Sequence, residues 1–183
     1  SPLREQRDAH SAQALAIARG LGDPAELAIA LQARHYALLA PDTLEQRMAI
    51  SIELSHFADA TGKRELVLRS MPWRVADLLD LGHVQAADRA IAEAERVAAD
   101  LRQPLYVWYV AMFRAQRSLM RGELAKGEHL AEQALALGRQ VQPSVAQIYY
   151  AAQLFVLRRE QGRLGELTPL FRSILIERPG MPV

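Results

Sequence analysis

The chain has 183 residues, of which 50% are hydrophobic and 23% are charged, a composition typical of a folded globular protein rather than a disordered one. Its formal net charge of +1 gives no electrostatic basis for binding nucleic acid or an anionic membrane. The absence of cysteine excludes disulfides, and the longest apolar run, residues 105–113, is too short to span a bilayer. We therefore expect a cytoplasmic bacterial protein.

The spacing of apolar residues is helical along the whole chain, and no segment alternates convincingly over the length of a strand. Short breaks that contain Gly or Pro separate the helical segments. Connections this short join consecutive helices into antiparallel hairpins. The predicted helices end near Leu21, Ala40, Thr61, Gly82, Leu101, Gly122, Val141, Gly162 and Arg178.

Several helix ends carry capping signals. Asp23 is placed to cap the second helix, with Pro24 at its first position and Glu26 completing an Asp-x-x-Glu box. Gly62 suits a left-handed residue after the third helix. Two further capping boxes pair Thr43 with Gln46 and Ser144 with Gln147.

Two prolines fall inside predicted helices. Pro72 lies far enough into the fourth helix to predict a kink or a later helix start, because proline lacks the N–H that a helix interior uses. Pro169 predicts the same for the ninth helix, which could instead begin near Thr168.

The clearest pattern is a forty-residue repeat. Gly82, Gly122 and Gly162 each follow an apolar helical run and precede an amphipathic one. Fixed periods of this size are typical of solenoids, in which each unit buries its face by stacking on its neighbours. Residues two, five, nine and twelve after each glycine share one helix face. They are Val84, Ala87, Ile91 and Ala94; Leu124, Gly127, Ala131 and Ala134; and Leu164, Leu167, Phe171 and Ile174.

We therefore predict an all-α fold, a right-handed solenoid of antiparallel helix pairs with tetratricopeptide-like units of about 40 residues. The chain is expected to form a single helical-repeat domain, with units at about residues 23–62, 63–102, 103–141 and 142–180. The last predicted helix is more apolar than a terminal helix needs, and the chain stops where another helix would begin. These features indicate a fragment of a longer protein, or a homodimer formed through terminal helices.

Three segments carry a resemblance to a known group of proteins: residues 33–38, 108–111 and 153–164. They resemble the C-terminal tetratricopeptide-like repeat region of large actinobacterial signalling proteins, and the longer unit is similar to the repeats of MalT-type bacterial regulators. In those proteins an NTPase module is joined to a LuxR-type DNA-binding domain or to a nucleotide cyclase. The resemblance implies a regulatory repeat region without catalytic residues.

No signature of catalysis or cofactor binding is present. The sequence lacks a phosphate-binding loop, a dinucleotide-binding fingerprint and a nucleophile elbow. Its five histidines include no pair at the His-x-x-x-His spacing that places two metal ligands on one helix face. We therefore expect no catalytic residues, no metal site and no cofactor.

Arginine recurs at the repeat spacing. Arg34, Arg74 and Arg114 stand forty residues apart, and in a stacked array such positions align on one surface. Guanidinium groups arranged in this way receive carboxylates or phosphates. The alternative, which we favour, is that each arginine pairs with an acidic residue of a neighbouring helix or lies beside the core. The next equivalent position is Leu154, which weakens the column.

Aromatic residues recur on the first helices of adjacent units. First helices line the concave groove of tetratricopeptide-like arrays, where aromatic residues with a polar end suit peptide or ligand capture. The alternative is ordinary core packing, which accounts for most of Trp108, Tyr109, Tyr149 and Tyr150. The offsets of the tetratricopeptide repeat place Tyr109 and Tyr149 on the inner side, joined by Tyr36.

The leading functional hypothesis is a non-catalytic domain for protein interaction or regulation within a bacterial transcriptional or signalling protein. Its partner is then a protein, a peptide or another domain of the same chain, with no direct contact to nucleic acid or membrane. The alternative is a sensor that holds a small anionic effector in the solenoid groove, and an enzyme is the third reading. The predicted binding residues are Arg34, Tyr36, Arg74, Tyr109, Arg114 and Tyr149.

Overall fold

A computed structural model describes residues 2–61 and 64–177. Over these ranges the chain forms nine α-helices and two short 3-10 helices and contains no strand, which confirms the all-α prediction. The chain divides into two compact units, an N-terminal unit of residues 1–101 and a C-terminal unit of residues 102–183. No helix of the described ranges is both long enough and apolar enough to cross a membrane.

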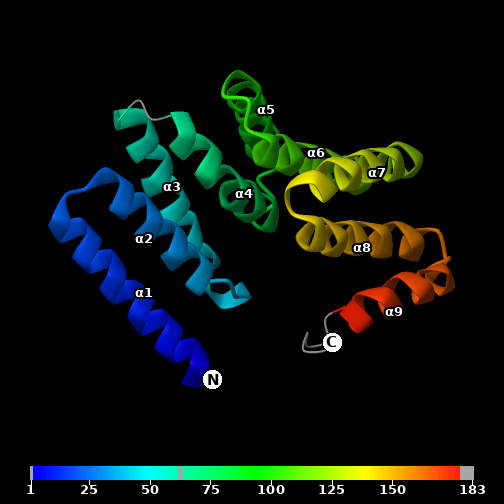
Figure 1. The fold of residues 1–183 in the computed structure, drawn as a ribbon, viewed down its shortest axis with the longest axis horizontal. Coiled ribbons are helices and arrows are strands. Elements are labelled where there is room, and N and C mark those ends of the chain that lie inside the picture. The colour runs from blue at the N-terminus through cyan, green and yellow to red at the C-terminus, as the bar shows by residue number, and fades with distance from the viewer. Residues whose placement is uncertain (1, 62–63, 178–183) are drawn as a thin grey trace. The chain divides into compact units, whose positions relative to one another are not determined.

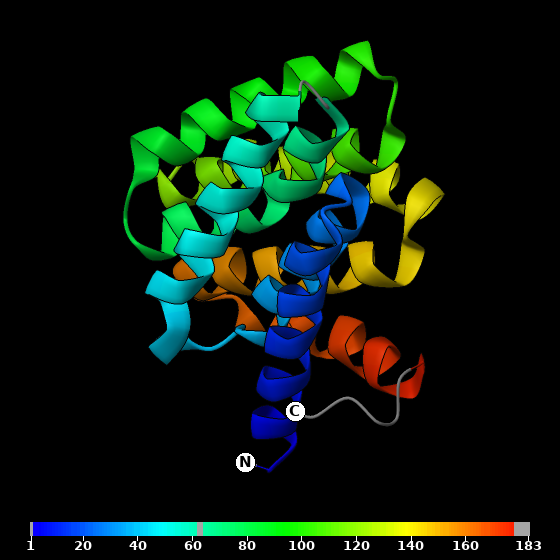
Figure 2. The ribbon, with the colours of Figure 1, turned by 90° about the vertical axis from the view of Figure 1, so that its left-hand side faces the viewer.

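The N-terminal unit consists of helices that pack in chain order, each against the next (Figures 1 and 2). Its core is formed by apolar side chains of the first four helices, with Leu31 and Leu54 among the most buried. Helices α2 and α4 also touch directly, although α3 separates them in the sequence. The elements are α1 (Pro2–Leu21), α2 (Pro24–Ala37), η1 (Pro41–Thr43), α3 (Leu44–Thr61), α4 (Arg64–Asp80) and α5 (Val84–Asp100).

The C-terminal unit repeats this arrangement. Its helices pack consecutively, and α6 and α8 touch directly as α2 and α4 do in the other unit. The elements are α6 (Pro104–Met120), α7 (Leu124–Val141), α8 (Pro143–Glu160), η2 (Leu164–Leu167) and α9 (Thr168–Glu177).

The three repeat glycines form the same turn. Gly82, Gly122 and Gly162 have φ values of +73°, +74° and +70°, the left-handed region that glycine enters without steric cost. The residue after each glycine donates its N–H to the carbonyl five residues earlier, the bond that closes a Schellman motif. The forty-residue period is therefore visible in the backbone as well as in the sequence.

The predicted packing face is buried in two of the three repeats. In α5 and α7, Ala87, Ile91, Ala131 and Ala134 are all buried. Val84 and Leu124 are only partly buried. In the third repeat only Leu167 of the described positions is buried, because Leu164 and Phe171 remain exposed at 43% and 37%. The side chain of Ile174 lies outside the described residues.

Small residues bring α7 close to its neighbours. A Cβ atom at Gly138 would lie 2.4 Å from Cβ of Ala146 in α8 and 2.5 Å from Nε1 of Trp108 in α6. A Cβ atom at Gly127 would lie 2.5 Å from Cδ2 of Leu119. Real Cβ atoms do not approach other atoms this closely, so a side chain at Gly138 would displace Ala146 or Trp108, whereas one at Gly127 would require the Leu119 side chain to move.

Some predicted helix ends are confirmed and others are wrong. Asp23 caps α2 as predicted, because its Oδ1 accepts the N–H of Ala25 at 2.7 Å and that of Glu26 at 3.2 Å. The Thr43 box is wrong, since the Thr43 hydroxyl donates to the carbonyls of Leu38 and Ala40 and so closes the end of α2.

The two proline predictions have different outcomes. Helix α4 runs through Pro72, so the predicted later start is wrong. Helix α9 does begin at Thr168, as Pro169 predicted, because proline is tolerated in the first turn. The Ser144 box is also wrong: Pro143 already opens α8, which places Ser144 inside the first turn. The predicted cap at Gly62 lies outside the described residues.

Candidate functional site

The structure brings Tyr109 and Tyr149 together beside one tryptophan. Trp108 of α6 is buried at 1% exposure, and its ring centroid lies 4.7 Å from that of Tyr109 and 6.0 Å from that of Tyr149 in α8. Tyr106 completes the group, 6.3 Å from Tyr109. We call these four residues the α6–α8 aromatic cluster. Tyr149 is 40% exposed, so the cluster has a buried base and an open side.

The two tyrosines keep neutral hydroxyls in this setting. Burial raises the pKa of the Tyr109 hydroxyl above its ordinary value, and the nearby Tyr149 and Tyr106 raise it further. Burial alone raises the pKa of Tyr149. At neutral pH the cluster therefore offers apolar rings with uncharged hydrogen-bonding groups, which suits a peptide with apolar and polar side chains.

The exposed surface continues along α8. Ala152 and Val156 are three and seven residues beyond Tyr149, the spacing that places side chains on one helix face, and all three are exposed. The ring of Phe155 packs edge-on against Phe171 of α9 at 6.4 Å. The open side of the aromatic cluster therefore extends as an apolar stripe along the helix.

Tyr36 occupies a comparable place in the N-terminal unit. It is 57% exposed, and its ring meets that of Trp73 in α4 at 6.1 Å with the edge-on geometry of favourable aromatic pairs. Trp73 was not among the predicted site residues. Its position beside Tyr36 means that an aromatic pair bridges α2 and α4, as another bridges α6 and α8.

The arginines behave largely as the packing alternative expects. Arg34 donates from Nη1 to the Asp8 carboxylate at 2.5 Å and to the Ser11 hydroxyl at 2.9 Å, which ties α2 to α1. Arg74 donates to the Ser55 hydroxyl at 2.9 Å and lies 3.9 Å from Glu93. Arg114 is exposed on α6 and also interacts within the chain. Arg34 and Arg74 therefore link neighbouring helices.

The N-terminal unit also contains a buried polar network that the sequence patterns did not predict. Asp77 of α4, with no exposed surface, accepts a hydrogen bond from Ser51 at 2.9 Å and lies 2.7 Å from Nε2 of His35. Arg47 of α3 places Nη1 2.9 Å from Asp77 and Nη2 3.1 Å from Asp80. These side chains join α2, α3 and α4 through one carboxylate.

The composition of this network is that of a serine hydrolase triad, but its connectivity is not. In a triad the serine hydroxyl bonds to the histidine, which in turn bonds to the carboxylate. Here Ser51 and His35 both face the same oxygen of Asp77. His35 and Ser51 are each only 2% exposed. The hydroxyl is therefore neither activated by the imidazole nor open to a substrate, and the network is a structural junction.

One signal in the sequence could have revealed this junction. Asp77, Arg117 and Leu157 each stand five residues before a repeat glycine, and all three are buried. An apolar residue is the ordinary occupant of a core position, so the aspartate there indicates a buried partner.

Neither the arrangement of possible metal ligands nor comparison with known proteins assigns a function to the chain. Among the described residues, no group of three or more His, Cys, Asp or Glu side chains is arranged to hold a metal ion. No model of a known protein family matches the chain, and no curated protein is significantly similar to it.

Proposed function

We propose that the chain is a non-catalytic helical-repeat domain that binds a protein or peptide partner. In this proposal the antiparallel hairpins are successive units of a right-handed, tetratricopeptide-like solenoid. The domain serves as an interaction or regulatory region of a bacterial signalling protein, as the resemblance of residues 33–38, 108–111 and 153–164 implies.

The observation that carries the proposal is the pairing of Tyr109 with Tyr149. These residues are forty apart, occupy the same position relative to the repeat glycines, and both have ring contacts with Trp108. Tyrosine and tryptophan dominate the binding energy of many interfaces, because they bury a large rigid area and retain a polar group. A packed tryptophan beneath them lowers the entropic cost of holding the rings in place.

The partner that suits this surface is an extended or helical segment with apolar side chains at regular spacing. The stripe of Tyr149, Ala152 and Val156 supplies contact along α8, and the tyrosine hydroxyls supply hydrogen bonds. Because the hydroxyls stay neutral, the surface does not demand a charged partner.

The proposal is tested by selecting peptides from a random library on the immobilised protein. We expect an enriched consensus with apolar residues, and Tyr149→Ala should weaken a selected peptide by about 2 kcal/mol, or roughly thirtyfold in Kd. Leu137→Ala, which alters an exposed apolar residue of α7, is the matched control and should leave the affinity unchanged. Failure to enrich any consensus, or equal losses in both variants, would contradict the proposal.

A further inference from the structure

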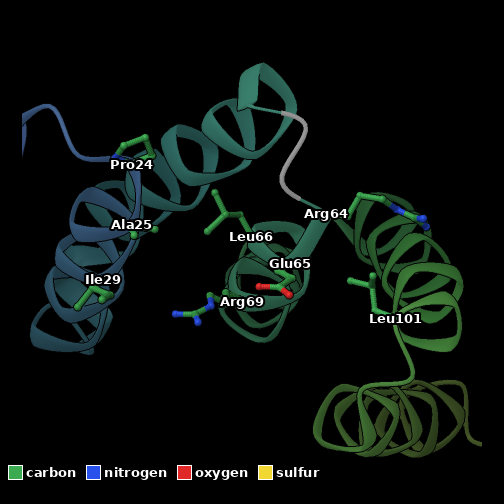
Figure 3. Close-up of a pocket in the computed structure, with 9 residues that line it drawn as sticks. Pro24, Ala25, Ile29, Arg64, Glu65, Leu66, Arg69 and Leu101 are labelled. Carbon is green, nitrogen blue, oxygen red and sulfur yellow. The ribbon is translucent and has the colours of Figure 1, made fainter.

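The N-terminal unit contains a groove that shares no residue with the α6–α8 aromatic cluster. Its volume is about 540 Å³, within the range of small-molecule sites. It lies between the first turns of α2 and α4 and reaches the end of α5 (Figure 3). Its apolar wall is formed by Ala25, Ala28, Ile29, Leu66 and Leu101.

The groove already has a buried floor and an open apolar rim. Ala28 and Leu66 are 1% and 6% exposed, so the base is fixed by the core of the unit. Ile29 is 51% exposed at the edge. An apolar ligand would cover Ile29 and remove part of this surface from water.

The polar part of the groove contains two arginines with different roles. Arg64 lies 2.6 Å from the Asp100 carboxylate of α5 and points toward that helix (Figure 3). Arg69 points from α4 toward α2, and within the described residues it has no hydrogen bond or ion pair. Arg69 is therefore a cation of the groove wall that forms no ion pair within the described residues.

The backbone N–H groups at the start of α2 are already bonded and do not bind an anion in the groove. The backbone N–H groups of Ala25 and Glu26 are both bonded to the Asp23 side chain, and Pro24 has no N–H. Anion recognition in the groove therefore depends on the Arg69 guanidinium rather than on the helix terminus.

The charge of the ligand is limited by a neighbouring carboxylate. Glu65 lines the groove one helical turn before Arg69, on the same face of α4. It repels an anion and competes for the same guanidinium, so a ligand with one negative charge is favoured over a doubly charged phosphate. Together with the apolar wall, this points to a carboxylate that carries an apolar chain.

The repeat register relates the Arg69 position of α4 to positions in the C-terminal unit. Arg69, Tyr109 and Tyr149 each stand thirteen residues before a repeat glycine. The position that carries a neutral aromatic hydroxyl in α6 and α8 carries a cation in α4. Equivalent surfaces of the two units are thus suited to different ligands.

We propose that the groove between α2 and α4 binds a monocarboxylate with an apolar chain, such as a medium-chain fatty acid, through Arg69. This site is independent of the partner surface around Tyr109 and Tyr149. The test uses octanoate and decanoate as anionic probes and 1-octanol as the neutral probe. Binding is followed by amide chemical shifts of the full chain.

We expect saturable shifts at Ala28, Ile29 and Leu66. Decanoate should bind about tenfold more tightly than octanoate, because each buried methylene contributes about 0.8 kcal/mol. Octanoate should bind more tightly than octanol. Arg69→Gln should weaken octanoate at least about tenfold, the loss expected for a charge-assisted hydrogen bond, and leave octanol unchanged.

Two matched variants complete the test. Arg96→Gln removes another exposed arginine of the same unit, on α5, and should not change octanoate binding. Glu65→Gln removes the repelling carboxylate and should tighten octanoate several-fold. Arg69 and Glu65 are both exposed, so neither change should affect folding.

Three results would overturn the inference. One is the absence of saturable shifts in the groove with millimolar decanoate. Another is equal binding of octanoate and octanol, or an unchanged affinity in Arg69→Gln. The third is a shift pattern spread over exposed apolar residues such as Leu3 and Ile17, which would indicate detergent-like adsorption. None of these results bears on the peptide test of the C-terminal unit.

Discussion

Replacing Asp77 tests whether the buried network holds the N-terminal unit together. In Asp77→Ala, His35 and Ser51 lose their shared acceptor, and Arg47 keeps only the half-exposed Asp80. Removing one partner of a buried ion pair costs about 3–5 kcal/mol. Because Asp80 still compensates part of the Arg47 charge, we expect about 3 kcal/mol. A unit of this size has a free energy of unfolding of only about 5–15 kcal/mol, so the loss is large.

The assay is urea unfolding followed by tryptophan fluorescence. The chain has two tryptophans, one in each unit, so a Trp108→Phe background leaves Trp73 as the reporter of the N-terminal unit. The Trp73 ring lies 5.1 Å from the His35 ring and therefore senses the network directly. Asp80→Asn is the matched control. It should cost less than about 1 kcal/mol, because Asp80 is 56% exposed.

A double variant separates the ion pair from simple loss of packing. Combined with Arg47→Met, Asp77→Ala should destabilise less than alone, because the uncompensated buried charge is also removed. If Asp77→Ala costs under about 1 kcal/mol, or if the two changes are additive within about 0.5 kcal/mol, the network does not hold α2, α3 and α4 together.

Three further predictions concern the C-terminal unit. Gly138→Ala should destabilise it by about 1–3 kcal/mol in chemical denaturation, because the added Cβ overlaps atoms of α6 and α8; a neutral effect would mean that α7 can move away freely. The hydrogen bond from Arg158 holds the pKa of Glu128 below its ordinary value of 4.5. The stability that this ion pair gives the folded chain is therefore complete above pH 4.5 and is lost as the pH falls through the folded-state pKa. Thermal melts between about pH 5 and pH 3 should therefore show a shallower decline for Glu128→Gln, and identical slopes would show that the pair does not contribute. Burial raises the pKa values of Tyr109 and Tyr149 above the ordinary 10.0, because the folded chain favours their neutral hydroxyls. This contribution to the stability of the folded chain is complete below pH 10 and is lost as the pH rises through the folded-state pKa values. Ultraviolet titration should show that these two tyrosines ionise at a higher pH than the tyrosines of the unfolded chain. Ionisation at the same pH as free tyrosine would contradict the burial of the two hydroxyls.

The parts of the fold that could be predicted from the sequence are those set by local chemistry or by the period. Gly82 and its equivalents were predictable because a left-handed turn after a helix favours glycine. The pairing of Tyr109 with Tyr149 followed from their forty-residue separation, since equal positions of stacked units are neighbours.

The errors arose where a nearby residue or a distant helix decided the outcome. Pro143 begins α8 one residue before Ser144, so the serine cannot cap it. The burial of Asp77 depends on partners from α2 and α3, and a helix pattern alone treats an aspartate as solvated.

The most direct test of the proposed function is to map a selected peptide onto the protein by amide chemical shifts. The largest shifts are expected at Tyr109, Tyr149 and Val156, with smaller shifts at the other residues of α8. Shifts confined to the N-terminal unit, or to α7 and α9, would place the partner elsewhere and contradict the assignment of the α6–α8 aromatic cluster as the binding surface.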